Sequence, residues 1–278
     1  MTLLLPQFPA TQMCTTTVHT TSLLGNLFYE NTRTTRFRKQ PLEKTSTGWL
    51  YAVTVLDFHQ TEQHGLAALD ADTAALRSEL LIETDQTGQL LRVCNKAHLR
   101  QQWAALHPKL RRKYKRSDTV TPGMVDGIGQ VLHGDGYLED ILRRGYEYGT
   151  LFPALYGQPY STTPTPGQPR TVARFLGNLD LPLSTTVQRQ EKVPDDMAYG
   201  LLVKGEFNPA EYPADAAQQA LRTLTDQYDL ATTLRVEHVE SYEFDRHREL
   251  CHAAQFTVYG VAGVFMNKTL CTMAAQVA

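Results

Sequence analysis

The segment HRELCH holds three side chains that could bind a metal ion, His247, Cys251 and His252. A structural zinc site usually takes four Cys or His ligands from two short clusters. Cys94 and His98 have the same four-residue step as His247 and Cys251, so they could supply the second cluster. This step is not the usual zinc-binding spacing. The sequence therefore predicts no metal site and leaves Cys94, His98, His247 and Cys251 as the candidates.

A charged turn between two strands is the alternative interpretation of HRELCH. The segment follows the alternating run LRVEHVESYEF and precedes the strand-like run that ends in FTVYGV. Turns that face solvent are typically polar. Because side chains alternate along a strand, Cys251 and His252 would face opposite sides and could not readily bind one ion. The pattern favours the turn.

His133 and Asp135 are the candidate catalytic residues, as an acid/base pair within the glycine-rich segment 123–136. The segment has no phosphate-binding loop pattern, and a basic helix and a polar turn precede it instead of a buried strand. The chain has no G-x-S-x-G, no H-E-x-x-H and no kinase signature. The glycines are therefore interpreted as a break between helical pieces, or as positions that let helices pack closely. A non-enzymatic protein without a cofactor is favoured.

The stretch 107–116, HPKLRRKYKR, could contact an acidic partner, because no Asp or Glu occurs from Gln86 to Ser117. Trp103 and Tyr114 share the apolar face of the expected helix with leucines, so they indicate core packing rather than base stacking. Nucleic acid is therefore not favoured, and a solvated helix face is the alternative to a protein partner. The candidate binding residues are Lys109, Arg111, Arg112, Lys113, Lys115 and Arg116.

The composition is that of an ordinary globular protein, with 42% hydrophobic and 20% charged residues among 278 and a formal net charge of −2. This charge gives no general attraction to nucleic acid or to an anionic membrane. Four dispersed cysteines are too few for a disulfide framework. The chain contains no apolar run long enough for a transmembrane helix, and its first residues do not resemble a signal peptide. A cytoplasmic location is expected.

Alternating and β-branched residues predict strands on both sides of a helical block. The threonine-rich segment 11–47 favours extended chain, and residues 48–58 alternate as a half-buried strand does. Residues 80–93 predict a hairpin with Gly88 in its loop. Further strands are expected at residues 172–176, 181–190, 199–207, 233–244, 251–261 and 264–274.

Helical spacing begins after Asn95, which is the expected N-cap. Pro108 should kink or divide this helix. Thr121 and Pro122 predict the start of a second helix, and the spacing resumes at Leu138 after a glycine-rich break. The expected apolar face of the second helix comprises Met124, Ile128, Val131 and Leu132, and Leu138, Ile141, Leu142 and Tyr146 continue the helical spacing. A last helix, opened by Pro213, should carry Ala216, Ala220, Leu221, Leu224 and Tyr228.

The sequence therefore predicts an α+β protein, with antiparallel β-sheet before and after a central helical block and one further helix inserted in the C-terminal meander. We expect an N-terminal part over residues 1–157, with helices at about 95–149. A proline-rich linker or long loop over 158–169 should lead to a C-terminal β-meander over 170–278. A single domain is equally compatible.

Three functions are compatible with these patterns. The favoured one is a non-enzymatic binding or assembly protein, which contacts a protein partner or a second copy of the chain through the basic helix and a tyrosine-rich surface. The tyrosines of that surface are Tyr137, Tyr146, Tyr148, Tyr156 and Tyr160. One alternative is a carrier of an apolar small ligand or lipid between sheet and helices, because the expected outline resembles ligand-carrying half-barrels in shape alone. The other is a hydrolase with a site near His133 and Asp135.

Overall fold

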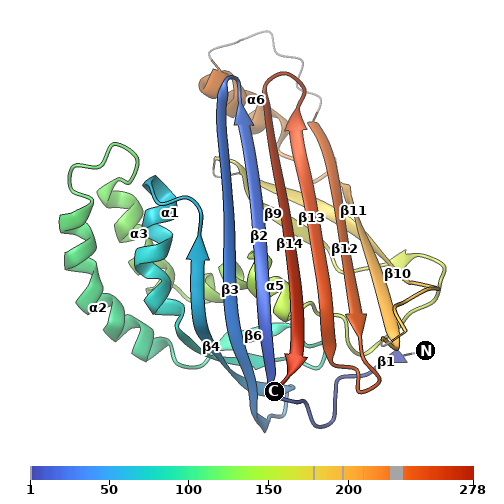
Figure 1. Ribbon diagram of the computed structural model, residues 1–278. Helices are drawn as coiled ribbons and strands as arrows, with labels where there is room; N and C mark the ends of the chain where they lie inside the picture. The colour runs from blue at the N-terminus through green and yellow to red at the C-terminus, as the bar shows by residue number, and fades with distance from the viewer. Residues whose placement is uncertain (1, 178, 196, 209, 226–233) are drawn as a thin grey trace. The chain divides into compact units, whose positions relative to one another are not determined.

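The computed structural model describes residues 2–177, 179–195, 197–208, 210–225 and 234–278 (Figure 1). The elements before the helical block are β1 (Thr2–Leu3), β2 (Gln12–Leu24), β3 (Leu27–Lys44), β4 (Trp49–Gln60), α1 (Gly65–Thr73), the 3-10 helix η1 (Ala74–Arg77), β5 (Glu79–Thr84) and β6 (Leu90–Val93). The helical block comprises α2 (Lys96–Lys113), α3 (Pro122–His133), α4 (Tyr137–Arg144) and α5 (Tyr146–Leu151). The elements after it are β7 (Gln158–Pro159), β8 (Thr165–Pro166), β9 (Arg170–Leu176), β10 (Leu179–Arg189), β11 (Tyr199–Phe207), α6 (Ala214–Thr225), β12 (Leu234–Phe244), β13 (Leu250–Val261) and β14 (Phe265–Val277).

Twelve strands form one sheet in the order β6-β5-β4-β3-β2-β14-β13-β12-β11-β10-β8, with β9 paired to β10. The pairs on either side of the helical block are antiparallel, as β4 with β5 and β12 with β13 show. The α+β class with antiparallel sheet before and after a central helical block is confirmed, and α6 is the helix inserted among the C-terminal strands. The threonine-rich segment forms β2 and β3, because β-branched side chains favour extended backbone.

The chain divides into two compact units that are not contiguous in sequence. Unit 1 comprises residues 1–4, 17–31 and 158–274. Unit 2 comprises residues 5–16, 32–157 and 275–278. Strands β2, β3 and β14 contribute residues to both units. The boundary expected at residues 158–169 stays a prediction, but that segment is not wholly irregular, since β7 pairs with β1 and β8 with β10.

The two hairpin turns that the sequence indicates are confirmed. Between β5 and β6, Gly88 has a φ of 80°, and the Asp85 carboxylate accepts a hydrogen bond from the Thr87 nitrogen at 2.8 Å. Between β12 and β13, the Asp245 carboxylate accepts from the His247 nitrogen at 2.8 Å and from the Glu249 nitrogen at 2.9 Å. Both turns follow one rule, in which an aspartate side chain satisfies backbone donors that the ladder leaves unpaired.

The predictions about α2 are confirmed in part. Asn95 is the N-cap residue, but its side chain makes no capping hydrogen bond; its Oδ1 accepts from the Leu81 nitrogen at 3.0 Å, which ties the helix start to β5. Pro108 lies inside one continuous helix and does not divide it. Because the proline nitrogen cannot donate to the carbonyl of Ala104, that carbonyl needs another partner, and exposure of Ala104 makes it accessible to water.

The predicted apolar face of α3 is wrong at its start. Met124 is 45% exposed, whereas Val125 is fully buried. Thr121 caps α3 as expected, and its hydroxyl accepts from the Met124 nitrogen at 3.3 Å. A Cβ on Gly129 would lie 2.6 Å from the Trp103 indole nitrogen, so glycine is what allows α3 to approach α2. Rotation of the buried face toward Trp103 explains why Met124 points outward.

The later helices follow the predicted spacing only in part. Leu138 and Leu142 of α4 are buried, but Ile141 is 46% exposed. Helix α6 buries Ala217 and Leu221 against the hydrophobic core of unit 1, which includes Phe175. Leu224 and Tyr228 are also expected on the apolar face of this last helix. The side chain of Leu224 and the whole of Tyr228 lie outside what the structure describes.

Two glycine substitutions test the β5–β6 turn. Gly88 and Gly157 both have positive φ, but a Cβ on Gly88 would lie 2.6 Å from the buried Tyr156 ring, while no atom lies within 4 Å of a Cβ on Gly157. We expect Gly88→Ala to lower the free energy of unfolding by about 2 kcal/mol or more, and Gly157→Ala by about 1 kcal/mol, since only the first adds a clash to backbone strain. Urea unfolding measures both, and equal losses would contradict the clash.

Candidate functional site

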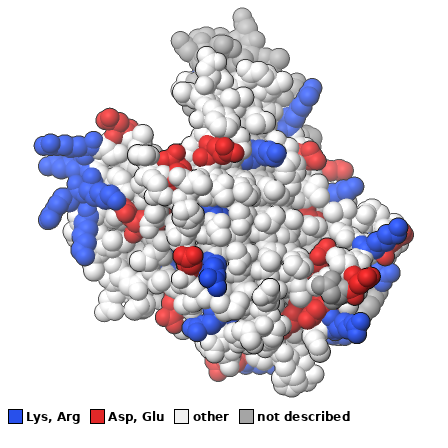
Figure 2. Space-filling view, viewed as in Figure 1, with Lys and Arg blue, Asp and Glu red and all other residues white. Residues whose placement is uncertain are grey.

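The six candidate binding residues on the basic stretch lie on or just after the last turns of α2 and are all exposed. Figure 2 shows Lys and Arg side chains gathered at the left edge of the view, over this helix. Two of the six are paired with carboxylates. Arg111 Nη1 contacts Asp126 of α3, and Lys113 Nζ lies 2.7 Å from Asp72 of α1. The stretch lacks acidic residues in sequence, but the fold brings two of them to it and reduces its local positive charge.

The candidate acid/base pair lies on the surface at the end of α3. His133 and Asp135 are both exposed, and the His133 Nδ1 lies 2.7 Å from the Gly129 carbonyl oxygen of its own helix. This contact within the helix occupies one of the two imidazole nitrogens of His133. The structure places neither residue in a cavity that it describes, so their catalytic role stays a prediction.

The metal candidates fall in different units. Cys94 and His98 are exposed in unit 2, while His247 and Cys251 belong to unit 1. Among the described residues no group of three or more His, Cys, Asp or Glu side chains could hold a metal ion. The Cys251 Sγ contacts the Glu249 carbonyl oxygen at 3.5 Å, a contact within the turn itself.

The tyrosine-rich surface is largely a tyrosine-rich core. Tyr148, Tyr156 and Tyr160 are 4%, 7% and 7% exposed, and only Tyr137, at 62%, is well exposed. The sequence interpretation fails here because tyrosine suits both a core edge and an interface, and its spacing does not separate the two. Three of the five tyrosines are therefore too buried to contribute to a contact surface.

An open cavity of about 680 Å³ lies in unit 1, where β12, β13 and β14 meet the β2–β3 turn. Its wall is mainly apolar and comes from segments that are far apart in sequence. The large apolar side chains of the wall are Leu23, Val236, Val258, Tyr259, Val261, Val264, Phe265 and Met266. Arg235 and Glu237, which are both exposed, add one charge of each sign. The volume is that of a small-molecule site.

Two local features, a backbone hydrogen bond and a close strand approach at a glycine, hold the segments that surround this cavity. The Gly25 nitrogen donates to the Val264 carbonyl oxygen at 3.0 Å, which joins the β2–β3 turn to the start of β14. A Cβ on Gly260 would lie 2.4 Å from the Phe265 carbonyl oxygen, so glycine permits the close β13–β14 approach. Val261, Val264 and Phe265 belong to the core that buries α6, and they continue that core into the cavity wall.

The β2–β3 turn also exposes apolar side chains beside the cavity. Leu23 lines the cavity and is 39% exposed, and Leu27 and Phe28 on the other side of the turn are 72% and 65% exposed. Large apolar side chains that gather on a surface mark sites of interaction with other molecules. The apolar wall of the cavity therefore lies close in sequence to an exposed apolar turn.

A buried charged cluster lies elsewhere in unit 1, where Arg170 at the start of β9 reaches Glu240 of β12. The Glu240 carboxylate is 1% exposed and accepts hydrogen bonds from the Arg170 guanidinium at 3.0 and 3.1 Å and from the Tyr242 hydroxyl at 2.9 Å. Its Oε1 also lies 2.9 Å from the Nε2 of His238. The other ring nitrogen of His238 lies 2.9 Å from the Thr257 hydroxyl.

Burial would raise the pKa of Glu240, but the Arg170 charge and the contact with His238 outweigh it and lower that pKa from 4.5 to about 2. Burial and the Glu240 charge raise the pKa of Tyr242 well above its ordinary value, so its hydroxyl stays protonated and donates. The arrangement of Thr257, His238 and Glu240 resembles a nucleophile–base–acid series. However, all three are nearly inaccessible and the carboxylate is bound by Arg170, so the cluster holds strands together.

Sequence reasoning missed both the cavity and the charged cluster. The alternation in LRVEHVESYEF, the sequence of β12, could have shown that His238, Glu240 and Tyr242 share one face. Nothing in the sequence pairs Glu240 with Arg170, because 70 residues separate them. The cavity has no sequence signal, since its wall combines the β2–β3 turn with three strand ends.

No protein-family model matches the chain, and no curated protein sequence matches it. A solved structure described as "lipid-protein interactions in lipovitellin" is similar in fold, with a TM-score of 0.50 and 9% sequence identity. The similarity covers 98% of this chain and 26% of that chain, so the chain spans about a quarter of its length. At this identity the likeness concerns the fold alone. None of the described helices is long and apolar enough to cross a membrane.

The charged cluster gives a pH-dependent prediction. A carboxylate whose pKa is lower in the folded protein stabilises it above about pH 4.5, and this contribution is lost as the pH falls toward about 2. We expect Glu240→Gln to lower the free energy of unfolding by about 3 kcal/mol at neutral pH, because it leaves the half-buried Arg170 without its counter-charge.

Urea unfolding of both proteins from about pH 7 to about pH 3 should show the difference becoming smaller as the pH falls. Glu237→Gln, an exposed change on the same strand, is the control and should alter stability little. A constant difference across this range would contradict the ionised, paired Glu240.

Proposed function

We propose that the protein is a carrier that binds an apolar ligand of the lipid class in the cavity of unit 1. The observation that carries the proposal is the cavity itself, about 680 Å³ in volume and walled by aliphatic and aromatic side chains. Ligand sites are typically about 300–1,000 Å³, mostly apolar, and supplied with a few polar groups that orient the ligand. Arg235 and Glu237 are the charged groups available here.

The likeness to lipovitellin supports the proposal at the level of fold. Lipid–protein interactions are described for that protein, and the likeness extends over 98% of this chain. Burial of apolar ligand surface contributes about 25 cal/mol per Å². Burial in an open, apolar cavity is therefore a source of binding free energy that requires no further chemical group.

No described residue of α6 lines the cavity, but Val261, Val264 and Phe265 join its wall to the core that α6 shares with the sheet. Tyr259 contributes to both, since it lines the cavity and packs its ring edge to face against Phe175 at 6.0 Å. A rigid aromatic wall of this kind keeps its shape without ligand, which lowers the entropy cost of binding.

Contact with a protein partner through α2, and a cytoplasmic location, stay predictions of the sequence. Four exposed cations of the basic stretch form no ion pair within the described ranges. They are Lys109, Arg112, Lys115 and Arg116. Such a surface is compatible with a carrier, because a partner could bind at α2 while the ligand occupies unit 1.

Ligand binding is tested with a fluorescent fatty acid titrated into the full chain. Leu23→Glu places a carboxylate in the wall of the cavity, and we expect it to weaken binding by about tenfold or more, because the charge must be desolvated against an apolar ligand. Leu42→Glu is the matched control, since Leu42 lies on β3 at 47% exposure and outside the cavity wall. Absence of saturable binding to the unmodified chain, or equal loss in both variants, would refute the proposal.

The apolar turn gives a kinetic prediction. We expect the double substitution Leu27→Ser and Phe28→Ser to slow transfer of the same fatty acid from lipid vesicles by severalfold, because these exposed side chains offer apolar contact beside the cavity. The affinity for the free fatty acid should change little, since neither residue lines the cavity. Stopped-flow fluorescence measures the transfer, and an unchanged rate would exclude a role for the turn.

A further inference from the structure

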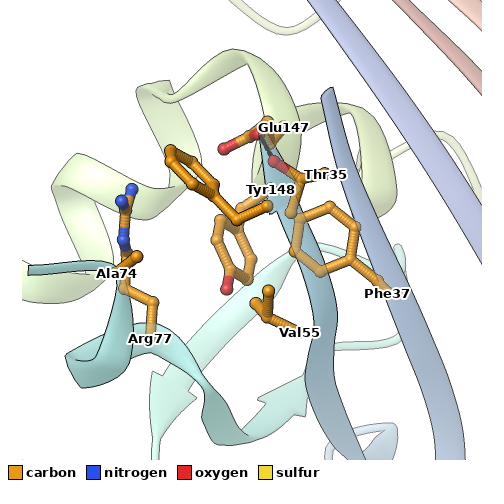
Figure 3. A pocket seen from close by; sticks show the side chains of 8 residues that line it. Thr35, Phe37, Val55, Ala74, Arg77, Glu147 and Tyr148 are labelled. Atoms are coloured by element: carbon orange, nitrogen blue, oxygen red, sulfur yellow. Dashed lines mark hydrogen bonds between the residues drawn. The ribbon is translucent and has the colours of Figure 1, made fainter. Parts of the chain in front are cut away.

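A second, much smaller cavity lies in unit 2, between β3, β4, η1 and α5, with about 10 Å³ of space. Figure 3 shows the Tyr148 ring between Phe37 on one side and Ala74 and Arg77 on the other. The Tyr148 and Phe37 rings meet edge to face, with centroids 5.7 Å apart. The cavity therefore forms where the helical block packs against the sheet of unit 2.

Tyr148 presents an unsatisfied polar group at this cavity. Its side chain lines the wall and is only 4% exposed, yet no protein group among the described residues hydrogen-bonds its hydroxyl. A buried hydroxyl without a partner is costly, and such groups in folded proteins usually bind ordered water. The other buried or half-buried polar residues of the wall are Thr35, Arg77 and Glu147.

The charges around the cavity are balanced within the protein. Arg33 contacts both Asp70 and Glu147 at 3.2 Å, and Arg77 contacts Asp70 at 2.7 Å. Two guanidinium groups thus face two carboxylates, and the Thr35 hydroxyl donates to Glu147 at 2.6 Å (Figure 3). Because no net charge remains, an ion of either sign would lack a counter-charge, whereas a neutral molecule fits.

We propose that this cavity binds a single ordered water molecule, which accepts a hydrogen bond from the Tyr148 hydroxyl and completes its bonding with polar groups of the wall. A water molecule needs at least about 10–15 Å³ of space for its centre, and this cavity, at about 10 Å³, has room for no more than one. The water links α5 to the wall formed by η1 and β4, so it is a site of structural binding in unit 2, independent of the ligand cavity of unit 1.

Tyr148→Phe tests the site, because it removes the hydroxyl and keeps the ring against Phe37. We expect the melting temperature of the full chain to fall by several degrees, as for loss of a satisfied buried hydrogen bond. Tyr114→Phe is the positive control, since the Tyr114 hydroxyl donates directly to Asp72 at 2.7 Å. An unchanged or higher melting temperature for Tyr148→Phe would show that the hydroxyl has no partner and would overturn the proposal.

A crystal structure of the full chain at high resolution tests occupancy directly. We expect density for one water at about 2.6–3.2 Å from the Tyr148 hydroxyl oxygen. Density that refines only as an ion, or no density in a well-ordered cavity, would also overturn the proposal.

Discussion

Because side chains alternate along an antiparallel strand, β12 sends His238, Glu240 and Tyr242 to one buried face of its sheet. A carboxylate on that face is tolerable only with a charged partner, and Arg170 of β9 supplies it. One ion pair therefore ties the start of β9 to the middle of β12, beside the backbone pairing of β9 with β10. The hydrophobic core with Phe175 and Leu181 then covers the adjoining part of the same face.

The apolar cavity and the charged cluster of unit 1 lie on different parts of the same strands. Near the middle of β12 the buried face is polar and fully bonded, so it is rigid and inaccessible. Toward the start of that strand, Val236 and its neighbours on β13 and β14 are apolar and line the open cavity. The proposed carrier function would use this combination, in which a firm polar interior keeps its shape beside an apolar, preformed site.

The sequence predicted well what local chemistry determines. Alternation and turn residues located the strands and both aspartate-based turns, because hydrogen bonds within a few residues decide them. It failed where a distant element decides: the Asn95 side chain bonds to β5 instead of to the first turn of α2, and Trp103 draws the buried face of α3 away from Met124. The cavity and the pairing of Glu240 with Arg170 belong to the same class, since both depend on contacts that no spacing encodes.

The distribution of β2, β3 and β14 over two compact units has a consequence for any cut in the backbone. A break within residues 158–169 would leave residues 1–4, 17–31 and a few residues after 157 on one fragment, and the rest of unit 1 on the other. Strand β2 would then have to find β14 as a separate chain, since the two are neighbours in the sheet. Such a nicked molecule would behave as a non-covalent complex of two fragments, and its persistence would depend on concentration.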